Sequence, residues 1–354
     1  MSNTIKTTLV IIGALIGAGF ASGQEIYLFF FSYGLEGAIG IIISTTLLGI
    51  VIYKALKIII DQDIHNYQEF LEYIVPSKTN NKIKIKIIQI INIIINLFIL
   101  ITFFIMIAGF GAYLKQSLGI PQIIGSSILA ILSLLILSKE TKGIIKVNEG
   151  LVPILILFII TIGICNIKNI NLLNIQNYIT KVNHTNWLVS GILYTSYNSI
   201  LLIPVLISIK KIIKPKQISK ISILVMILTT ILALSVFIGM IKIDVDISKL
   251  EMPISYVVAN QFSYLKGIYG IVILASILTT AISLGAGFLQ DVAKTEKARK
   301  NWLIAICIIS IPVSQIGFAN LINLLYPVFG YLGLGIIFCY VPKIRLPKGQ
   351  EKFE

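Results

Sequence analysis

Long apolar stretches alternate with short polar connections along the whole chain. A membrane-spanning helix needs about 20 consecutive apolar residues, and ten stretches come near this length. They run over 7–31, 36–60, 87–113, 121–138, 148–166, 187–209, 218–241, 265–289, 301–318 and 320–341. The pattern predicts an all-α integral membrane protein with about ten transmembrane helices. We expect one transmembrane domain over 1–354, with a short cytoplasmic tail at 342–354.

The ten predicted spans divide into two halves that cross the membrane in opposite directions. Repeat one covers about 5–166 and repeat two about 186–341. The connection at 64–74 has near-helical hydrophobic spacing, which predicts an amphipathic surface helix. The equivalent connection of the second half is expected to hold another short helix at 253–260. Inverted repeats of this kind are common in secondary transporters. The sequence therefore predicts a 5+5 inverted repeat.

Composition and charge strengthen the membrane assignment. Hydrophobic residues make up 56% of the chain and charged residues 12%, whereas soluble domains carry about 25% charged residues. With the N-terminus inside, 23 of the 29 Lys and Arg residues fall on the inside, and six fall outside: Lys115, Lys168, Lys181, Lys242, Lys249 and Lys266. This asymmetry follows the positive-inside rule and predicts cytoplasmic N- and C-termini in a bacterial cell membrane. The basic residues are spread over every inside connection. The net charge of +14 therefore does not indicate a nucleic-acid partner.

The first span contains four glycines within eleven residues, Gly13, Gly17, Gly19 and Gly23. Each glycine costs a helix interior about 1 kcal/mol relative to alanine. Lipid supplies no hydrogen-bond partners to a broken helix, so a break must face protein or a cavity. Discontinuous helices at mid-membrane build solute and ion sites in many transporters. We therefore expect the first helix to be discontinuous at a binding site.

The sixth span carries an unusually polar run at its centre. The run 194–199 reads Tyr-Thr-Ser-Tyr-Asn-Ser and is flanked by Gly191 and Pro204. If the two halves are related, the sixth helix breaks here as the first one does. The alternative is a continuous or merely kinked helix, because membrane helices tolerate Pro and Ser.

The stretch Gly17-Ala-Gly-Phe-Ala-Ser-Gly-Gln-Glu25 resembles the signature near the N-terminus of the YkvI-type bacterial membrane proteins. These form a branch of the amino acid–polyamine–organocation superfamily, which shares the LeuT-type fold. The resemblance covers essentially the whole chain in length, span count and the positions of the broken helices. It implies ten core spans, first and sixth helices unwound at their centres, and alternating access. Its implied substrates are amino acids or related amines.

The predicted substrate site joins the two interrupted spans. Backbone amides after the first break suit an anionic group, and carbonyls before it suit an ammonium group or a cation. The expected substrate-binding residues are Gly17, Ala18, Gly19, Phe20, Ala21, Ser22 and Gly23, with Tyr194, Ser196, Tyr197 and Asn198 opposite. A zwitterionic amino acid matches this arrangement, and an amine or a small amide stays open.

Glu25 is an acidic residue inside the first predicted span. Intramembrane carboxylates mark functional sites by default. Glu25 is therefore a candidate external gate, proton acceptor or counter-charge for an amine. The alternative is a buried glutamate that only holds the second half-helix in place.

A second match concerns a sodium site. Thr279 and Thr280 in the eighth span resemble the hydroxyl pair with which sodium-coupled relatives bind Na⁺. The same resemblance assigns further ligands to carbonyls of Ser276, Gly13 and Ile16. Oxygen ligands suit a hard cation, although small hydroxyl residues also pack helices together. The fifth-span core, 151–165, lacks the lysine that replaces this ion in proton-coupled relatives, which favours Na⁺ over H⁺ as the coupling ion.

Other function classes find little support in the sequence. The two histidines are far apart, the three cysteines form no CxxC pair, and the hydrolase and nucleotide-binding motifs are missing. We expect a transporter with a small-molecule substrate and the lipid bilayer as partners, without enzyme activity or a resident cofactor. A non-transporting nutrient sensor on the same fold and a channel are the alternatives, and oligomeric partners are left open. The run Phe29–Phe31 is expected to face lipid or the membrane interface.

Overall fold

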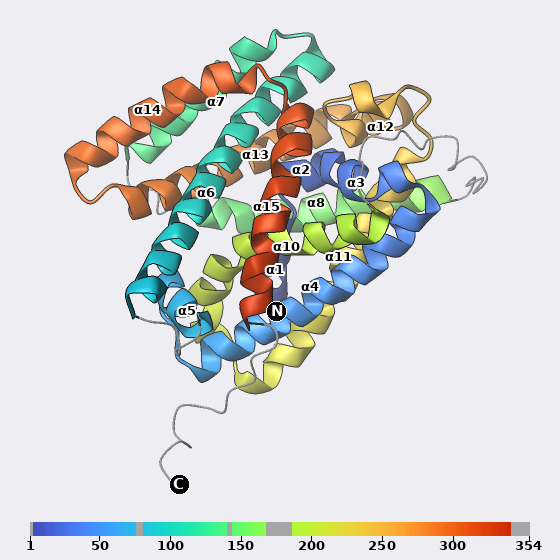
Figure 1. Ribbon diagram of the computed structural model, residues 1–354. Coiled ribbons are helices and arrows are strands. Elements are labelled where there is room, and N and C mark those ends of the chain that lie inside the picture. Colours follow the sequence, from blue (N-terminus) through green and yellow to red (C-terminus); the bar gives the residue numbers. More distant parts are fainter. Residues whose placement is uncertain (1–2, 76–80, 140–143, 168–185, 341–354) are drawn as a thin grey trace.

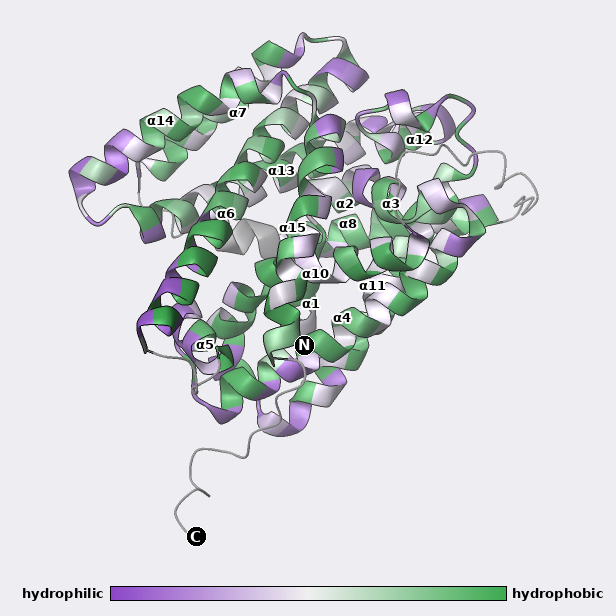
Figure 2. Cartoon of the chain, in the orientation of Figure 1, coloured by the Kyte–Doolittle hydropathy of each residue, from purple (hydrophilic) through white to green (hydrophobic). Residues whose placement is uncertain are grey.

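The computed structural model describes residues 3–75, 81–139, 144–167 and 186–340, and these ranges fold entirely into helices and their connections (Figure 1). The predicted all-α class is thereby confirmed. The tail at 342–354 lies outside the described residues. Figure 2 shows green, apolar residues along most helices and purple, hydrophilic residues near their ends.

Seven helices among the described residues are long and apolar enough to cross a membrane. They are α4 (Leu35–Asp61), α6 (Asn81–Leu118), α8 (Ile144–Ile167), α10 (Trp187–Ile209), α11 (Ile218–Met240), α13 (Lys266–Val292) and α15 (Phe318–Tyr340). The first, fourth and ninth predicted spans are also helical, but none of their helices is both long and apolar enough to be counted among these seven. The fourth is the 16-residue α7 (Gln122–Leu137). The ninth, α14 (Glu296–Ser314), begins with charged turns and ends four residues before its predicted boundary at 318.

The first span is broken, as predicted. It consists of α1 (Asn3–Leu15), α2 (Ala18–Ser22) and α3 (Gln24–Phe29), followed by the short 3₁₀ turn η1 (Phe31–Tyr33). The first break falls at residues 16–17. A second, unpredicted break falls at Gly23, whose φ of 88° lies in the left-handed region that glycine enters without steric cost.

The predicted break in the sixth span is wrong. Helix α10 continues through the polar run and through Pro204. The Ser196 hydroxyl donates to the Ile192 carbonyl at 2.9 Å, and the Asn198 amide donates to the Tyr194 carbonyl at 2.9 Å. Polar side chains that bond to carbonyls one turn earlier are satisfied within the helix. Polarity alone therefore does not unwind this segment.

The helices form two groups with two helices between them. Helices α1 and α4 each pack against both α10 and α11, and α6, α7, α13 and α14 all pack against one another. Helix α8 contacts α11 and α13, and α15 contacts α10 and α6. In Figure 1 the second group occupies the upper left and α4, α10 and α11 the lower right. The cavity described below lies where α1 and α10 face α6 and α13.

Two short helices lie at opposite ends of the molecule in Figure 1, α5 (Tyr67–Ile74) and α12 (Pro253–Gln261). Both occupy connections in which the sequence predicts a short helix. Helix α5 buries Phe70, Leu71 and Ile74 on one face, which confirms its amphipathic character.

The connection before α5 is fastened to the end of α10 by an ion pair. The Lys210 ammonium lies 2.9 Å from Asp63 Oδ1 and 2.6 Å from the Ile64 carbonyl oxygen. The hydrogen bond and positive charge of Lys210 lower the pKa of the exposed Asp63 carboxyl below its usual value.

Candidate functional site

A cavity of about 630 Å³ runs along one face of α1. Lys6, Val10, Gly13 and Gly17 line it at helical spacing, and Glu25 lies at its inner end. Lys6 is exposed, whereas Glu25 is 4% exposed. The cavity therefore reaches from the surface beside the start of α1 to the buried break in the first span.

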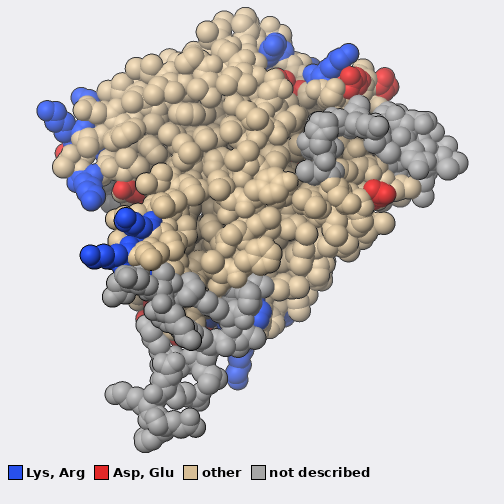
Figure 3. All heavy atoms as spheres, viewed as in Figure 1, with Lys and Arg blue, Asp and Glu red and all other residues tan. Residues whose placement is uncertain are grey.

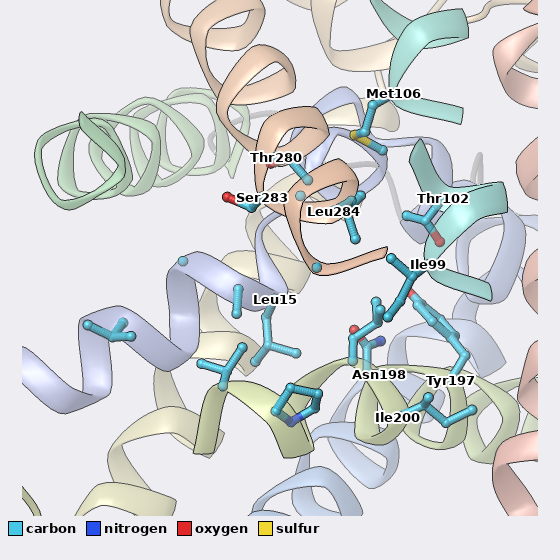
Figure 4. A pocket seen from close by; sticks show the side chains of 18 of the residues that line it. Leu15, Ile99, Thr102, Met106, Tyr197, Asn198, Ile200, Thr280, Ser283 and Leu284 are labelled. Atoms are coloured by element: carbon cyan, nitrogen blue, oxygen red, sulfur yellow. The ribbon is translucent and has the colours of Figure 1, made fainter. Parts of the chain in front are cut away.

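Three further helices supply most of the remaining wall. Figure 4 shows labelled side chains from α6, α10 and α13 around the space beside Leu15 of α1. The lining residues beyond those named above are Leu9, Ala14, Leu15, Ile95, Ile99, Thr102, Met106, Val152, Tyr197, Asn198, Ile200, Leu201, Pro204, Val205, Thr280, Ser283, Leu284, Gly287 and Tyr326. Most of this wall is apolar, so its few polar groups decide what orientation a solute takes.

Packed residues close the region beyond Glu25. The Tyr269 hydroxyl on α13 donates to the Ala21 carbonyl at 2.9 Å. Ile254 of α12 fills the space beside Gly23. The Gln116 side chain on α6 bonds both the amide and the carbonyl of Met252, at 3.0 and 2.9 Å. These contacts connect α2, α12, α13 and α6 on the side away from the cavity mouth, so packed side chains of the described residues close the end beyond Glu25.

Glu25 folds back from α3 onto α2. The Tyr197 hydroxyl donates to Glu25 Oε2, and the Phe20 backbone amide donates to the same carboxylate. Gly19 lies directly beneath it, because any β-carbon at position 19 would overlap Glu25 Oε1. A hydroxyl from α10 and the backbone of α2 therefore position the carboxylate at the inner end of the cavity.

Aromatic rings hold the Tyr197 side chain in place. Its ring lies 5.4 Å from the Phe29 ring, nearly parallel at 21°, and 4.8 Å from the Tyr326 ring. The expectation that the Phe29–Phe31 run faces lipid is wrong: each of the three side chains is at most 1% exposed. The second break turns α3 into the protein, and Phe29 and Phe30 pack there against the Tyr194 ring.

The structure divides the predicted substrate and charge residues into two sets. Gly17, Glu25, Tyr197 and Asn198 line the cavity. Ala18, Gly19, Phe20, Ala21, Ser22, Gly23, Tyr194 and Ser196 are all buried outside its lining. The Ser22 hydroxyl, for instance, donates to the Gly19 carbonyl at 2.9 Å within α2. This second set supports the wall from behind.

The predicted sodium ligands are divided in the same way. Gly13 and Thr280 line the cavity from facing helices. Ile16, Ser276 and Thr279 are buried behind the wall. The Thr279 hydroxyl donates to the Ser276 carbonyl at 3.0 Å.

Sequence reasoning missed the α6 wall. Ile95, Ile99, Thr102 and Met106 line the cavity at the spacing i, i+4, i+7 and i+11. Three of the four side chains are apolar, so this stripe looks like any lipid-facing or packing face. The more polar stripe at 89, 92 and 96, which also has helical spacing, is not in the lining.

The charged groups of the cavity are few. Among the described residues, Glu25 and Lys6 are the two charged ones in its lining. Within the described ranges, no group of three or more His, Cys, Asp or Glu residues is placed to hold a metal ion. A divalent cation normally takes several oxygen ligands, often carboxylates. The cavity instead offers one carboxylate with neutral hydroxyl and amide groups beside it.

Two curated proteins match nearly the whole chain. The membrane protein YkvI of Bacillus subtilis (strain 168) is 28% identical over 340 residues, which cover 94% of this chain and 93% of the relative. The resemblance to the YkvI-type membrane proteins is confirmed. The protein YyaD of the same organism is 25% identical over 347 residues, 95% of each chain. No protein-family model matches the chain.

The solved structures similar in fold include the manganese transporter of Eremococcus coleocola. Its complex with an aromatic bis-isothiourea compound matches with a TM-score of 0.55 and 16% identity, over 96% of this chain and 78% of that one. A histidine-to-alanine mutant of the same transporter matches with a TM-score of 0.54 at 16% identity, over the same shares of both chains. At this identity the likeness concerns the fold. With the seven long apolar helices among the described residues and the membrane relative YkvI, it makes the chain a multi-pass membrane protein.

Proposed function

We propose that the protein is a secondary active transporter that moves a small solute by alternating access. The observation that carries this proposal is a cavity that opens toward one end and stops at a buried carboxylate in a broken helix. Such a break at mid-membrane is typical of solute sites in secondary transporters. The fold likeness to a manganese transporter supports the same function.

The proposal includes a ten-helix, LeuT-like 5+5 arrangement. Repeat one comprises the helices from α1 to α8, and repeat two those from α10 to α15. The short helices α5 and α12 occupy equivalent connections, which supports the repeat. With both termini cytoplasmic in the cell membrane, the cavity opens to the cytoplasm, because Lys6 beside the N-terminus lines it. In Figure 3, Lys and Arg gather on the left near the start of α14 and the start of α6, which are inside connections in this arrangement.

The proposed substrate is an amino acid or a related amine. Gly17, Glu25, Tyr197 and Asn198 would contact it, with the buried residues of α2 as their support. The similar manganese transporter suggests a divalent metal as a second candidate. Among the described residues the cavity is lined by a single carboxylate, which favours an organic solute, since Mn²⁺ sites typically combine several oxygen ligands.

The proposed coupling ion is Na⁺, bound by Gly13, Ile16, Ser276, Thr279 and Thr280. We expect the double variant Thr279→Val with Thr280→Val to lose Na⁺-dependent uptake, because valine keeps the side-chain shape and removes both hydroxyl ligands. Uptake into proteoliposomes with an inward Na⁺ or choline gradient measures this. Thr46→Val removes an exposed hydroxyl on α4 and is the matched control. Unchanged Na⁺ dependence in the double variant would remove the sodium site from the proposal.

The transport proposal is tested with the full-length purified protein. Its thermal stability is measured against amino acids and amines, because a ligand of the native state raises the denaturation midpoint. Compounds that stabilise are then tested for uptake into liposomes. Binding without uptake would favour the alternative of a nutrient sensor. A conductance that does not saturate would favour a channel, although the packed region beyond Glu25 argues against a continuous path.

A further inference from the structure

The Glu25 carboxylate lies against the α2 backbone, where the sequence predicts the anionic group of a bound solute. From this arrangement we infer that the transported solute is an organic cation without a carboxylate, an amine with an apolar body whose charged group pairs with Glu25. The inference rests on the proposed transport function and narrows its substrate class.

The first argument is that two hydrogen-bond donors at the inner end are already engaged. The Phe20 amide and the Tyr197 hydroxyl both donate to the Glu25 carboxylate. The β-carbon space at Gly19 is filled by Glu25 Oε1. A solute carboxylate would have to displace Glu25 from these donors. An ammonium group needs acceptors instead, and the carboxylate already lies in the cavity wall.

The second argument is electrostatic. Glu25 is 4% exposed, and charges interact more strongly in such a poorly hydrated region than in water. A lone charge buried to this extent is costly, so a second anion beside Glu25 would add to that cost, while a cation there pairs with the carboxylate and offsets it. The other charged lining residue, Lys6, lies at the exposed mouth. Ten residues of α1, about 15 Å at 1.5 Å per residue, separate Lys6 from the break at Ile16. Lys6 is thus too far away to pair with the carboxylate of an amino acid whose ammonium contacts Glu25.

The third argument comes from the walls. Between the two charged ends the cavity presents mainly aliphatic side chains, among them Ile95, Ile99, Val152 and Leu284. A volume of about 630 Å³ falls within the range of about 300 to 1,000 Å³ that is usual for small-molecule sites. One carboxylate at the end of an apolar chamber matches a monovalent amine with a hydrocarbon body.

The experiment compares each amine with the amino acid that differs from it by the carboxylate. Isopentylamine is paired with leucine, and phenethylamine with phenylalanine. Binding to the purified full-length protein is measured by thermal shift and calorimetry. We expect each amine to bind at least tenfold more tightly than its amino acid partner. This comparison uses the unmodified chain and needs no variant to fold.

The variant Glu25→Gln tests the pairing directly, through the difference in affinity between an amine and its amino acid partner. It removes the negative charge and keeps the shape, so affinity for isopentylamine should fall at least tenfold while the difference between the two partners shrinks or inverts. Glu36→Gln, at the exposed start of α4, is the matched control and should leave both affinities unchanged.

The outcomes separate this inference from the transport proposal. If leucine or phenylalanine binds as tightly as its amine and enters liposomes, the cationic substrate class is wrong and the transport function stands. If no compound of either pair binds or is taken up, both fall together. Amine binding that Glu25→Gln leaves unchanged would also overturn the pairing with Glu25.

Discussion

The two sides of the cavity's inner end, α1–α3 and α10, are built on different principles. The first side is rich in glycine and is broken twice, at residues 16–17 and at Gly23. The second is rich in Ser, Thr, Asn and Tyr, contains a proline, and remains one continuous helix. The difference indicates that a span breaks where glycines let the backbone adopt non-helical dihedral angles. Polar side chains alone do not break it, because they bond to their own helix.

The two sides also contribute different groups to the site. The α2 backbone approaches Glu25 closely because Gly19 has no side chain. Helix α10 contributes side chains, the Tyr197 hydroxyl above all. A close backbone approach and a directed hydroxyl together hold one carboxylate.

Among the variants that test this difference between the two sides, Gly23→Ala is expected to lose the most stability. The residue has φ of 88°, which costs a non-glycine residue about 1–2 kcal/mol. A methyl group there would also lie 2.8 Å from Ile254 Cγ1, and overpacking costs about 1–3 kcal/mol. We expect a loss of roughly 2–4 kcal/mol of stability, seen as a lower thermal denaturation midpoint in detergent.

The matched control is Gly267→Ala in the first turn of α13, where a β-carbon would meet nothing within 4 Å. Its midpoint should be unchanged or slightly higher. A Gly23→Ala variant as stable as this control would show that the second break does not depend on glycine.

An intermediate effect is expected from Tyr197→Phe, which removes the hydrogen bond from α10 to Glu25. A buried carboxylate that loses a donor costs about 1–3 kcal/mol, so the denaturation midpoint should fall. Tyr264→Phe, at a tyrosine that is 77% exposed, is the control and should change stability by at most about 0.5 kcal/mol. If the two variants behave alike, the hydroxyl contributes nothing to holding Glu25.

The smallest effect is expected from Ser196→Ala in α10. The hydroxyl bonds to the Ile192 carbonyl of its own helix and is absent from the cavity lining. Loss of such a bond should lower stability by about 0.5–1.5 kcal/mol at most and leave amine binding unchanged. If Ser196→Ala abolished amine binding, the result would indicate that α10 opens at Ser196 during transport and that the two sides are less different than the structure shows.

Much of the fold could be predicted from the sequence. All ten apolar segments are helical where described, α5 and α12 lie in the connections predicted to hold short helices, and the first span breaks among its glycines. The site was only partly predictable. Gly17, Glu25, Tyr197 and Asn198 line the cavity, and their role in substrate binding stays a prediction. The α6 stripe gave no signal because its residues are mostly apolar.

The sequence by itself determined the membrane class, the helical segments and the position of the first break. These follow from local properties, because hydrophobicity, helical spacing and glycine's backbone freedom act within a few turns of chain. Only the tertiary structure decided that Glu25 folds back onto α2, that Phe29–Phe31 are buried, and that the α6 face bounds a cavity instead of meeting lipid. Those outcomes depend on which helix faces meet in space. An apolar face has the same local pattern whether it faces lipid, another helix or a solute.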